Sequence, residues 1–165
     1  VSGASLRVVA GGPTRQQSVA HGLAALPTEA DVVLVHDAAR FLTPPSLFVE
    51  VVAEVAAGHV AVVPGLPVVD TLKEVDDSAQ VVATPDRSRL RAVQTPQGFR
   101  RRTLEDAHRA AVERGDLDAT DDAGLVERVD GVVYVVPGHE EAFKVTRPLD
   151  LRLAEALLAR RGVAS

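Results

Sequence analysis

Short apolar runs alternate along the chain with stretches in which apolar residues recur every three or four positions. Short valine-rich runs predict strands buried in a sheet, and the helical spacing predicts helices with one buried face. The predicted strands are residues 6–10, 32–35, 60–63, 90–93, 132–136 and 143–145. The predicted helices are residues 15–26, 43–58, 102–113, 120–128 and a last helix that opens at 146–148. This alternation predicts an α/β fold with right-handed βαβ units and a mostly parallel sheet flanked by helices.

Local signals mark several helix ends. Thr43 precedes two prolines and is predicted to cap the second helix, which Gly58 should end. Thr120-Asp121-Asp122 is predicted to cap the fourth helix. The expected buried stripes are Leu47, Val51, Val52 and Val55 in the second helix, and Leu149, Leu153, Ala156 and Leu157 in the last. We expect the last helix to pack on the sheet.

Residues from about 67 to 94 lack helical periodicity and interrupt the alternation. Residues 68–75 and 80–84, separated by a polar turn at Asp76-Asp77-Ser78, predict an extended two-stranded β-arm. Two strands alone are marginally stable in water, so this arm should rest on a partner subunit or on its own domain. No repeat or second-domain linker is evident, so residues 1–165 are expected to form a single domain.

The composition narrows the range of functions. The 165 residues are 46% hydrophobic and 25% charged, as is typical of a globular protein. A net charge of -5 and 3% aromatic residues give no support for nucleic-acid binding. No apolar run approaches the roughly 20 residues that cross a membrane, so no membrane partner is expected. There is no cysteine, which excludes disulfides and is in keeping with the cytoplasmic location that we expect.

The run at residues 32–35 leads directly into a polar sequence, His36-Asp37-Ala38-Ala39-Arg40. Ligands of open α/β sheets bind beyond the carboxyl ends of the strands. There a carboxylate such as Asp37 can hold a divalent cation, and Arg40 can bind a phosphate. His36 is interpreted as a structural hydrogen-bonding residue at the end of the strand. A solvated turn would explain the same residues.

Further polar clusters lie where predicted strands end or helices begin. Each alone is more often a turn, a helix cap or a solvated side chain. Together, carboxylates, cations and glycines in one α/β domain favour a phosphate or nucleotide site. The clusters are Gly11–Ser18, Asp37–Arg40, Thr95–Gln97, Thr120–Asp122, and Lys144 with Thr146.

The same clusters carry a family resemblance over essentially the whole chain. The chain resembles the 2-C-methyl-D-erythritol 4-phosphate cytidylyltransferases, and His-Asp-Ala-Ala-Arg followed by Thr-Pro-Gln is the most specific part of the match. The matching motifs, in order, are Gly11-Gly12-x-x-Arg15-x-x-Ser18-Val19, Val35–Arg40, Asp70-Thr71-x-Lys73, Thr95-Pro96-Gln97-x-Phe99, Thr120-Asp121-Asp122 and Lys144-Val145-Thr146.

The resemblance implies a Rossmann-like nucleotidyltransferase fold of the GT-A type and a defined reaction. Methylerythritol 4-phosphate would attack the α-phosphate of CTP, forming 4-diphosphocytidyl-2-C-methyl-D-erythritol and releasing pyrophosphate, a step in isoprenoid precursor synthesis. It implies that Asp37 and Lys144 are catalytic and that Asp37 binds Mg²⁺ or another divalent cation. The implied nucleotide-binding residues are Gly11, Gly12, Ser18, Asp37 and Ala38, and the implied methylerythritol phosphate-binding residues are Arg40, Thr95, Thr120 and Lys144.

The resemblance also implies a homodimer joined through the arm, in which Thr71 and Arg87 serve the partner subunit's substrate.

At Pro13 the chain departs from the acidic or small residue common in the family. Relatives begin with a strand and a glycine-rich loop that carries a catalytic arginine and lysine, and no such loop precedes Gly11. We therefore expect a C-terminal portion of such an enzyme, nearly inactive alone.

Two other functions remain open at the level of the sequence. A sibling cytidylyltransferase acting on another polyol phosphate, such as ribitol 5-phosphate, would share the fold and several motifs. A non-catalytic binding or dimerisation module that kept the fold is the other alternative.

Overall fold

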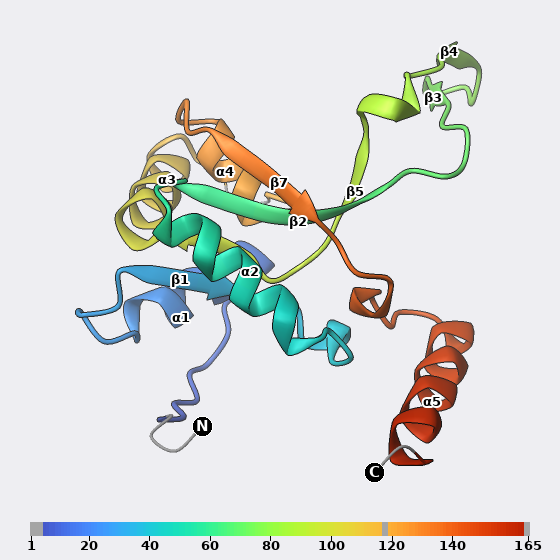
Figure 1. The fold of residues 1–165 in the computed structure, drawn as a ribbon. Helices are drawn as coiled ribbons and strands as arrows, with labels where there is room; N and C mark the ends of the chain where they lie inside the picture. Colours follow the sequence, from blue (N-terminus) through green and yellow to red (C-terminus); the bar gives the residue numbers. More distant parts are fainter. Residues whose placement is uncertain (1–4, 117–118, 164–165) are drawn as a thin grey trace.

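The computed structural model describes residues 5–116 and 119–163 and shows a sheet between two layers of helices (Figure 1). The sheet contains β1 (Val32–Val35), β2 (Ala61–Pro67), β5 (Arg91–Val93), β6 (Gln97–Arg100) and β7 (Val133–Pro137). The helices are α1 (Arg15–Ala24), α2 (Pro45–Ala56), α3 (Arg101–Glu113), α4 (Asp122–Glu127) and α5 (Pro148–Val163). Short 3-10 turns are η1 (Ala38–Arg40), η2 (Arg87–Arg89) and η3 (Glu140–Ala142).

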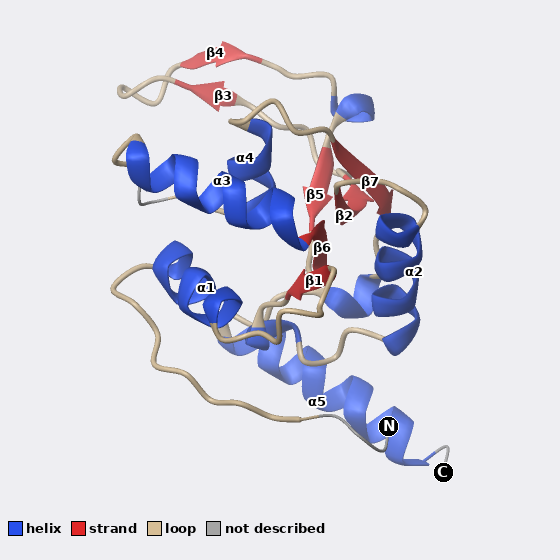
Figure 2. Cartoon of the chain, turned by 90° about the vertical axis from the view of Figure 1, so that its left-hand side faces the viewer, coloured by secondary structure: helices blue, strands red, loops and turns tan. Residues whose placement is uncertain are grey.

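Each face of the sheet has its own hydrophobic core, as Figure 2 shows with α1, α3 and α4 on one side and α2 on the other. Phe99 of β6 and Leu104 of α3 lie in the larger core, and both are fully buried. Val51 and Val55 of α2 pack with Val62 of β2 in the smaller core. The α/β class predicted from the alternation of patterns is therefore confirmed.

The prediction of a mostly parallel sheet is wrong for the described strands. β6 runs antiparallel to both β1 and β2, β5 runs antiparallel to β2, and β7 alone pairs with β2 in parallel. β1 and β2 therefore point the same way, as expected of strands joined through α2, but β6 lies between them. The segment that returns from the arm forms this inserted strand, which contains no apolar run to reveal it.

Two predicted strands are absent from the described chain. Residues 6–10 are exposed and pair with no described strand; Arg7 Nη1 instead donates to the carbonyl of Ala25 at 2.8 Å. Residues 143–145 follow η3 as irregular chain, and the N–H of Val145 donates to the carbonyl of Ala39 at 2.9 Å. A short apolar run becomes a strand only where a neighbouring strand offers a hydrogen-bonding edge.

Three expectations about the helices also need correction. Pro44 is the N-cap residue of α2, and the Thr43 hydroxyl donates to the carbonyl of Arg40 at 2.7 Å instead of capping the helix. Val52 is 38% exposed, whereas Leu47, Val51 and Val55 are buried as predicted. α5 lies beside the sheet, away from its faces, and its predicted stripe is largely exposed, with Leu149 73% and Leu153 51% exposed (Figure 1).

The predicted arm is confirmed as an antiparallel pair, β3 (Glu74–Val75) and β4 (Val81–Ala83), which projects from the body of the molecule (Figure 1). Its predicted first strand, residues 68–75, is wrong in length, because residues 68–73 are irregular chain that pairs with no described strand. The Asp76 carboxylate accepts hydrogen bonds from the N–H groups of Ser78 and Gln80, which fixes the turn between the strands. Among the described residues, no helix is long and apolar enough to cross a membrane.

Candidate active site

The site begins where β1 leaves the sheet. Asp37 is the N-cap residue of η1, but its side chain makes no capping hydrogen bond. The carboxylate is therefore available to other groups, and its side chain is 19% exposed. Ala38, the next residue, is exposed at the start of η1.

Three cationic side chains from separate parts of the chain converge on the Asp37 carboxylate. Lys144 Nζ lies 3.2 Å and Arg40 Nε 3.6 Å from Oδ2, and Arg15 Nε lies 3.9 Å from Oδ1. Arg40 belongs to η1, Lys144 follows η3, and Arg15 begins α1. One carboxylate among three cations leaves an excess of positive charge, which suits a ligand that carries several negative charges.

Backbone contacts hold two of these cations in place. Arg40 Nη1 donates to the carbonyl of Ala142 in η3 at 2.7 Å. The hydrogen bond from Val145 to Ala39 fixes the residue next to Lys144 against η1. Burial lowers the pKa of Arg40 below its ordinary value, and the neighbouring Asp37 carboxylate opposes that shift.

Thr95 supports the same corner from the junction of β5 and β6. Its hydroxyl oxygen accepts a hydrogen bond from the N–H of Asp37 at 3.0 Å and lies 3.0 Å from Nδ1 of His36. Burial lowers the pKa of His36, with smaller opposing effects from a backbone hydrogen bond at Arg40 and from the Asp37 charge. The His36 ring also packs edge-on against Phe48, with 4.9 Å between ring centroids.

The glycine-rich turn before α1 forms a second, adjoining part of the site. The N–H of Gly12 donates to the Ser18 hydroxyl at 3.0 Å, and that hydroxyl donates to the carbonyl of Thr14 at 2.9 Å. A Cβ atom on Gly12 would stand 2.5 Å from Cβ of Gln17, so the turn needs glycine there. Thr14 and Gln17 form a reciprocal capping box that fixes the start of α1.

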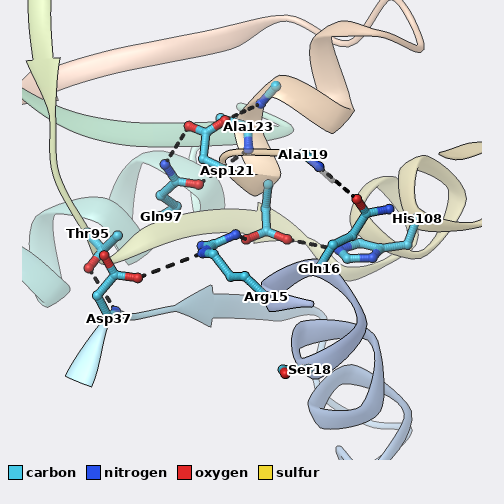
Figure 3. Close-up of polar contacts among 12 residues, drawn as sticks. Arg15, Gln16, Ser18, Asp37, Thr95, Gln97, His108, Ala119, Asp121 and Ala123 are labelled. Atoms are coloured by element: carbon cyan, nitrogen blue, oxygen red, sulfur yellow. Dashed lines mark hydrogen bonds and ion pairs between the residues drawn. The ribbon is translucent and has the colours of Figure 1, made fainter. Parts of the chain in front are cut away.

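A polar network behind the site links α1 to α4 (Figure 3). Arg15 Nη1 lies 2.8 Å from Oδ2 of Asp122, whose other oxygen lies 2.9 Å from Nε2 of His108. Gln16 Oε1 accepts from the N–H of Ala119, and Gln97 Nε2 donates to Oδ2 of Asp121, each at 3.0 Å. None of these contacts is predicted by the sequence. Arg15 stands in a quoted motif, but His108 belongs to none.

The structure brings part of the predicted site together. Asp37, Arg40, Thr95 and Lys144 meet at the end of β1, and Arg15 joins this corner to the α1 turn that holds Gly11, Gly12 and Ser18. Thr120 is exposed one residue before Asp121, the N-cap residue of α4, and Asp121 caps that helix as predicted by accepting from the N–H of Gly124.

Two predicted substrate residues stand apart from this corner. Thr71 and Arg87 belong to the exposed arm region, which extends away from the sheet (Figure 1). The Arg87 guanidinium donates to the carbonyl of Val69 within the same region. Their assignment to a partner subunit stays a prediction, as do the ligand-binding roles of the other residues.

The residues at the site fit a magnesium ion that is held partly by the substrate's phosphates. The described residues contain no group of three or more histidine, aspartate or glutamate side chains that could enclose a metal ion. Mg²⁺ at phosphate-transfer sites is often held by one or two carboxylates together with phosphate oxygens and water. Asp37, a partly exposed carboxylate among three cationic side chains, fits that arrangement.

The chain is similar in sequence to several curated bacterial proteins. A 2-C-methyl-D-erythritol 4-phosphate cytidylyltransferase from Streptomyces coelicolor is 58% identical over 160 residues, which are 93% of this chain and 58% of the relative. A Bifunctional enzyme IspD/IspF from Clavibacter michiganensis is 54% identical over 94% of this chain and 37% of the relative. The chain thus spans less than two thirds of the length of these relatives.

A solved structure agrees with these relatives. The 2-C-methyl-D-erythritol 4-phosphate cytidylyltransferase from Thermus thermophilus matches with a TM-score of 0.80 at 42% identity, covering 95% of this chain and 78% of that one. The model of the 2-C-methyl-D-erythritol 4-phosphate cytidylyltransferase family matches residues 1–160. With its convergent cations at Asp37 and its glycine turn at α1, the chain belongs to the 2-C-methyl-D-erythritol 4-phosphate cytidylyltransferase family.

Proposed function

We propose that this chain carries the site at which a cytidylyl group passes from CTP to 2-C-methyl-D-erythritol 4-phosphate. A phosphate oxygen of the polyol forms a bond to the α-phosphorus of CTP, the bond from that phosphorus to the bridging β-phosphate oxygen breaks, and pyrophosphate leaves. The observation that carries the proposal is the convergence of Lys144, Arg40 and Arg15 on one carboxylate at the end of β1. The layered α/β/α arrangement supports a Rossmann-like nucleotidyltransferase fold of the GT-A type.

The turn before α1 is suited to the nucleotide. Gly11 is exposed and Gly12 is half-buried, and the Ser18 hydroxyl holds the N–H of Gly12 in place. Backbone groups at such a turn can bind the edge of a cytosine base. Ala38 and Asp37, where β1 ends, would lie beside the ribose and phosphates of the same nucleotide.

The cations beside Asp37 are suited to the two phosphate-bearing substrates. Negative charge grows on the leaving pyrophosphate as the bond to the α-phosphorus breaks, and fixed cations stabilise such charge. Lys144 is about half exposed and can reach a substrate phosphate, while Arg40 is held by Ala142. Thr95 and the exposed Thr120 complete the proposed polyol phosphate subsite.

Asp37 would hold Mg²⁺, or another divalent cation, together with phosphate oxygens. When bound, the cation neutralises phosphate charge and makes the α-phosphorus more open to attack. Thr71 and Arg87 are exposed in the projecting arm region, and we propose that they reach the substrate of a partner subunit in a homodimer.

A pyrophosphate-release assay with CTP and Mg²⁺ tests the proposal, using the longest natural protein that contains this chain. Turnover is expected with methylerythritol 4-phosphate, and Lys144→Gln should lower kcat by about 100- to 1,000-fold, the usual loss of one electrostatic donor. Arg109→Gln, which removes an exposed partner of Asp106 on α3, is the matched control and should leave kcat unchanged.

Other outcomes of the assay would contradict the proposal. Faster turnover with ribitol 5-phosphate would assign the site to a different polyol phosphate. Absence of turnover with either polyol, together with absence of CTP binding, would favour a non-catalytic binding module.

A further inference from the structure

Arg15 joins two carboxylates that belong to different elements, although the motif in which it stands gave it no role. Its Nη1 lies 2.8 Å from Oδ2 of Asp122, and its Nε lies 3.9 Å from Oδ1 of Asp37. Figure 3 shows the guanidinium lying beneath β6, directed toward Asp37 on one side. Arg15 thus connects the interior of the helical layer to the corner where the substrates are proposed to meet.

The Asp122 end of this connection is rigid. Asp122 is the first residue of α4, and its side chain is fully buried. Its other oxygen lies 2.9 Å from Nε2 of His108, a buried residue of α3. With Oδ1 held by His108, the buried carboxylate presents Oδ2 to the guanidinium of Arg15.

The two carboxylate oxygens of Asp37 face different cations. Oδ1 faces Arg15, whereas Oδ2 faces Arg40 and Lys144. A guanidinium is a rigid planar fork, so an arginine whose Nη1 is held at Asp122 sets the direction from which its Nε meets Asp37. Without that contact, nothing in the described residues would keep Oδ1 turned away from Arg40 and Lys144.

We infer that Arg15 is a positioning residue: anchored by buried Asp122, it fixes the direction of the Asp37 carboxylate. The consequence for nucleotide binding rests on the proposed function, in which Asp37 meets the metal-bound phosphates of CTP. Arg15 itself acts through Asp37 and is not assigned a contact with the substrate.

A purely structural role for Arg15 makes a different prediction. Buried Asp122 needs a nearby cation, because an uncompensated buried charge is strongly destabilising. If this were all that Arg15 did, Arg15→Lys would change little, since lysine keeps the charge. If Arg15 positions Asp37, the same change should matter, because an ammonium group lacks the fork that spans both carboxylates.

The test measures the affinity for the Mg²⁺ complex of CTP by titration calorimetry, in the longest natural protein that contains this chain. Arg15→Lys should raise Kd by about 10- to 100-fold, as is typical when a group orienting a metal-binding residue is lost. In an Asp37→Asn background the same change should alter Kd by less than about threefold, because coupled residues are not additive. Arg109→Lys, at the exposed pair with Asp106, should leave Kd unchanged in both backgrounds.

Equal losses in both backgrounds, or no loss in either, would overturn the inference. If Arg15→Lys lowers the melting temperature, the double variant Arg15→Gln/Asp122→Asn is compared in its place, because it removes both charges together.

Failure of the unaltered protein to bind the complex would refute the proposed function alone. The positioning role is then decided by a crystal structure of Arg15→Lys without ligand: an Asp37 carboxylate turned toward Arg40 and Lys144 supports it, and an unmoved carboxylate refutes it.

Discussion

The backbone N–H of Asp37 donates a hydrogen bond to the hydroxyl of Thr95, with 3.0 Å between nitrogen and oxygen. Thr95 lies between β5 and β6, and β6 is the strand that pairs with β1. One hydroxyl therefore ties the point where the chain leaves β1 to the neighbouring strand. This contact holds in place the backbone from which the Asp37 side chain projects.

Replacing Thr95 by valine should destabilise the fold through this contact. Thr95 is 5% exposed, and valine keeps its shape but leaves the N–H of Asp37 without an acceptor. We expect the free energy of unfolding to fall by about 1–3 kcal/mol, the usual cost of a buried donor left unpaired. Thr95→Ser keeps the hydroxyl and should lose less. Urea denaturation of both variants checks the order, and equal losses would contradict it.

The stability of the fold should decrease as His36 becomes protonated. Burial lowers the pKa of His36 below its ordinary value of 6.5, so the unfolded chain takes up this proton at a higher pH than the folded chain. The stabilisation from neutral His36 is fully present above 6.5 and is lost as the pH falls through the folded pKa.

Urea denaturation of the protein and of His36→Asn, at about pH 7.5 and about pH 5, measures this contribution. The unfolding free energy of the unaltered protein should fall more between the two conditions than that of His36→Asn. The other four histidines are the same in both proteins and therefore cancel in the comparison. An equal fall in both would show that His36 titrates normally in the fold.

A strand can be predicted from the sequence only where its own residues form an apolar run, and even such a run needs a partner strand. Val32–Val35 is an apolar run and is a strand, but residues 6–10 are also such a run and pair with no described strand. Gln97–Arg100 carries no apolar run, yet it forms the strand between β1 and β2. Its state depends on two partners far away in the sequence, and such pairing leaves no periodic signal.

The same distinction applies to the site. Asp37 and Arg40 are three residues apart after a strand, so their sequence position predicts that they lie together. Lys144 belongs to one of the polar clusters that favour a phosphate site, but only the resemblance assigns it to the same substrate as Arg40, because the chain that brings it to Asp37 crosses several elements. The Arg15–Asp122 contact joins the first helix to the fourth, and nothing local to either residue indicates the other.

A methyl group at Gly98 should disrupt the contact between β6 and α2. A Cβ atom there would stand 2.5 Å from Cγ1 of Val51 and 3.1 Å from Cγ2 of Val55, both fully buried. Gly98→Ala is expected to lower the free energy of unfolding by about 1–3 kcal/mol, as overpacking of a core does. Urea denaturation measures the loss.

Val51→Ala provides the matched test of that clash, because it removes the Cγ1 atom that the new methyl group would meet. The Gly98→Ala/Val51→Ala protein should be more stable than the sum of the two single losses predicts. Residues in contact show interaction energies of about 0.5–3 kcal/mol, so the departure from additivity is measurable. Strict additivity would show that the two sites do not touch.

Two glycines with open surroundings should respond to alanine in opposite directions. Gly22 lies within α1 and Gly58 follows α2 with a φ of +124°, and a Cβ atom at either would meet nothing within 4 Å. Gly22→Ala should raise the free energy of unfolding by about 0.5–1 kcal/mol, because alanine favours the helix. Gly58→Ala should lower it by more than about 1 kcal/mol, because alanine rarely adopts a positive φ. Since neither methyl group makes a contact, the difference between the two melting temperatures reports backbone conformation alone. An unchanged stability of Gly58→Ala would contradict the positive φ at the end of α2.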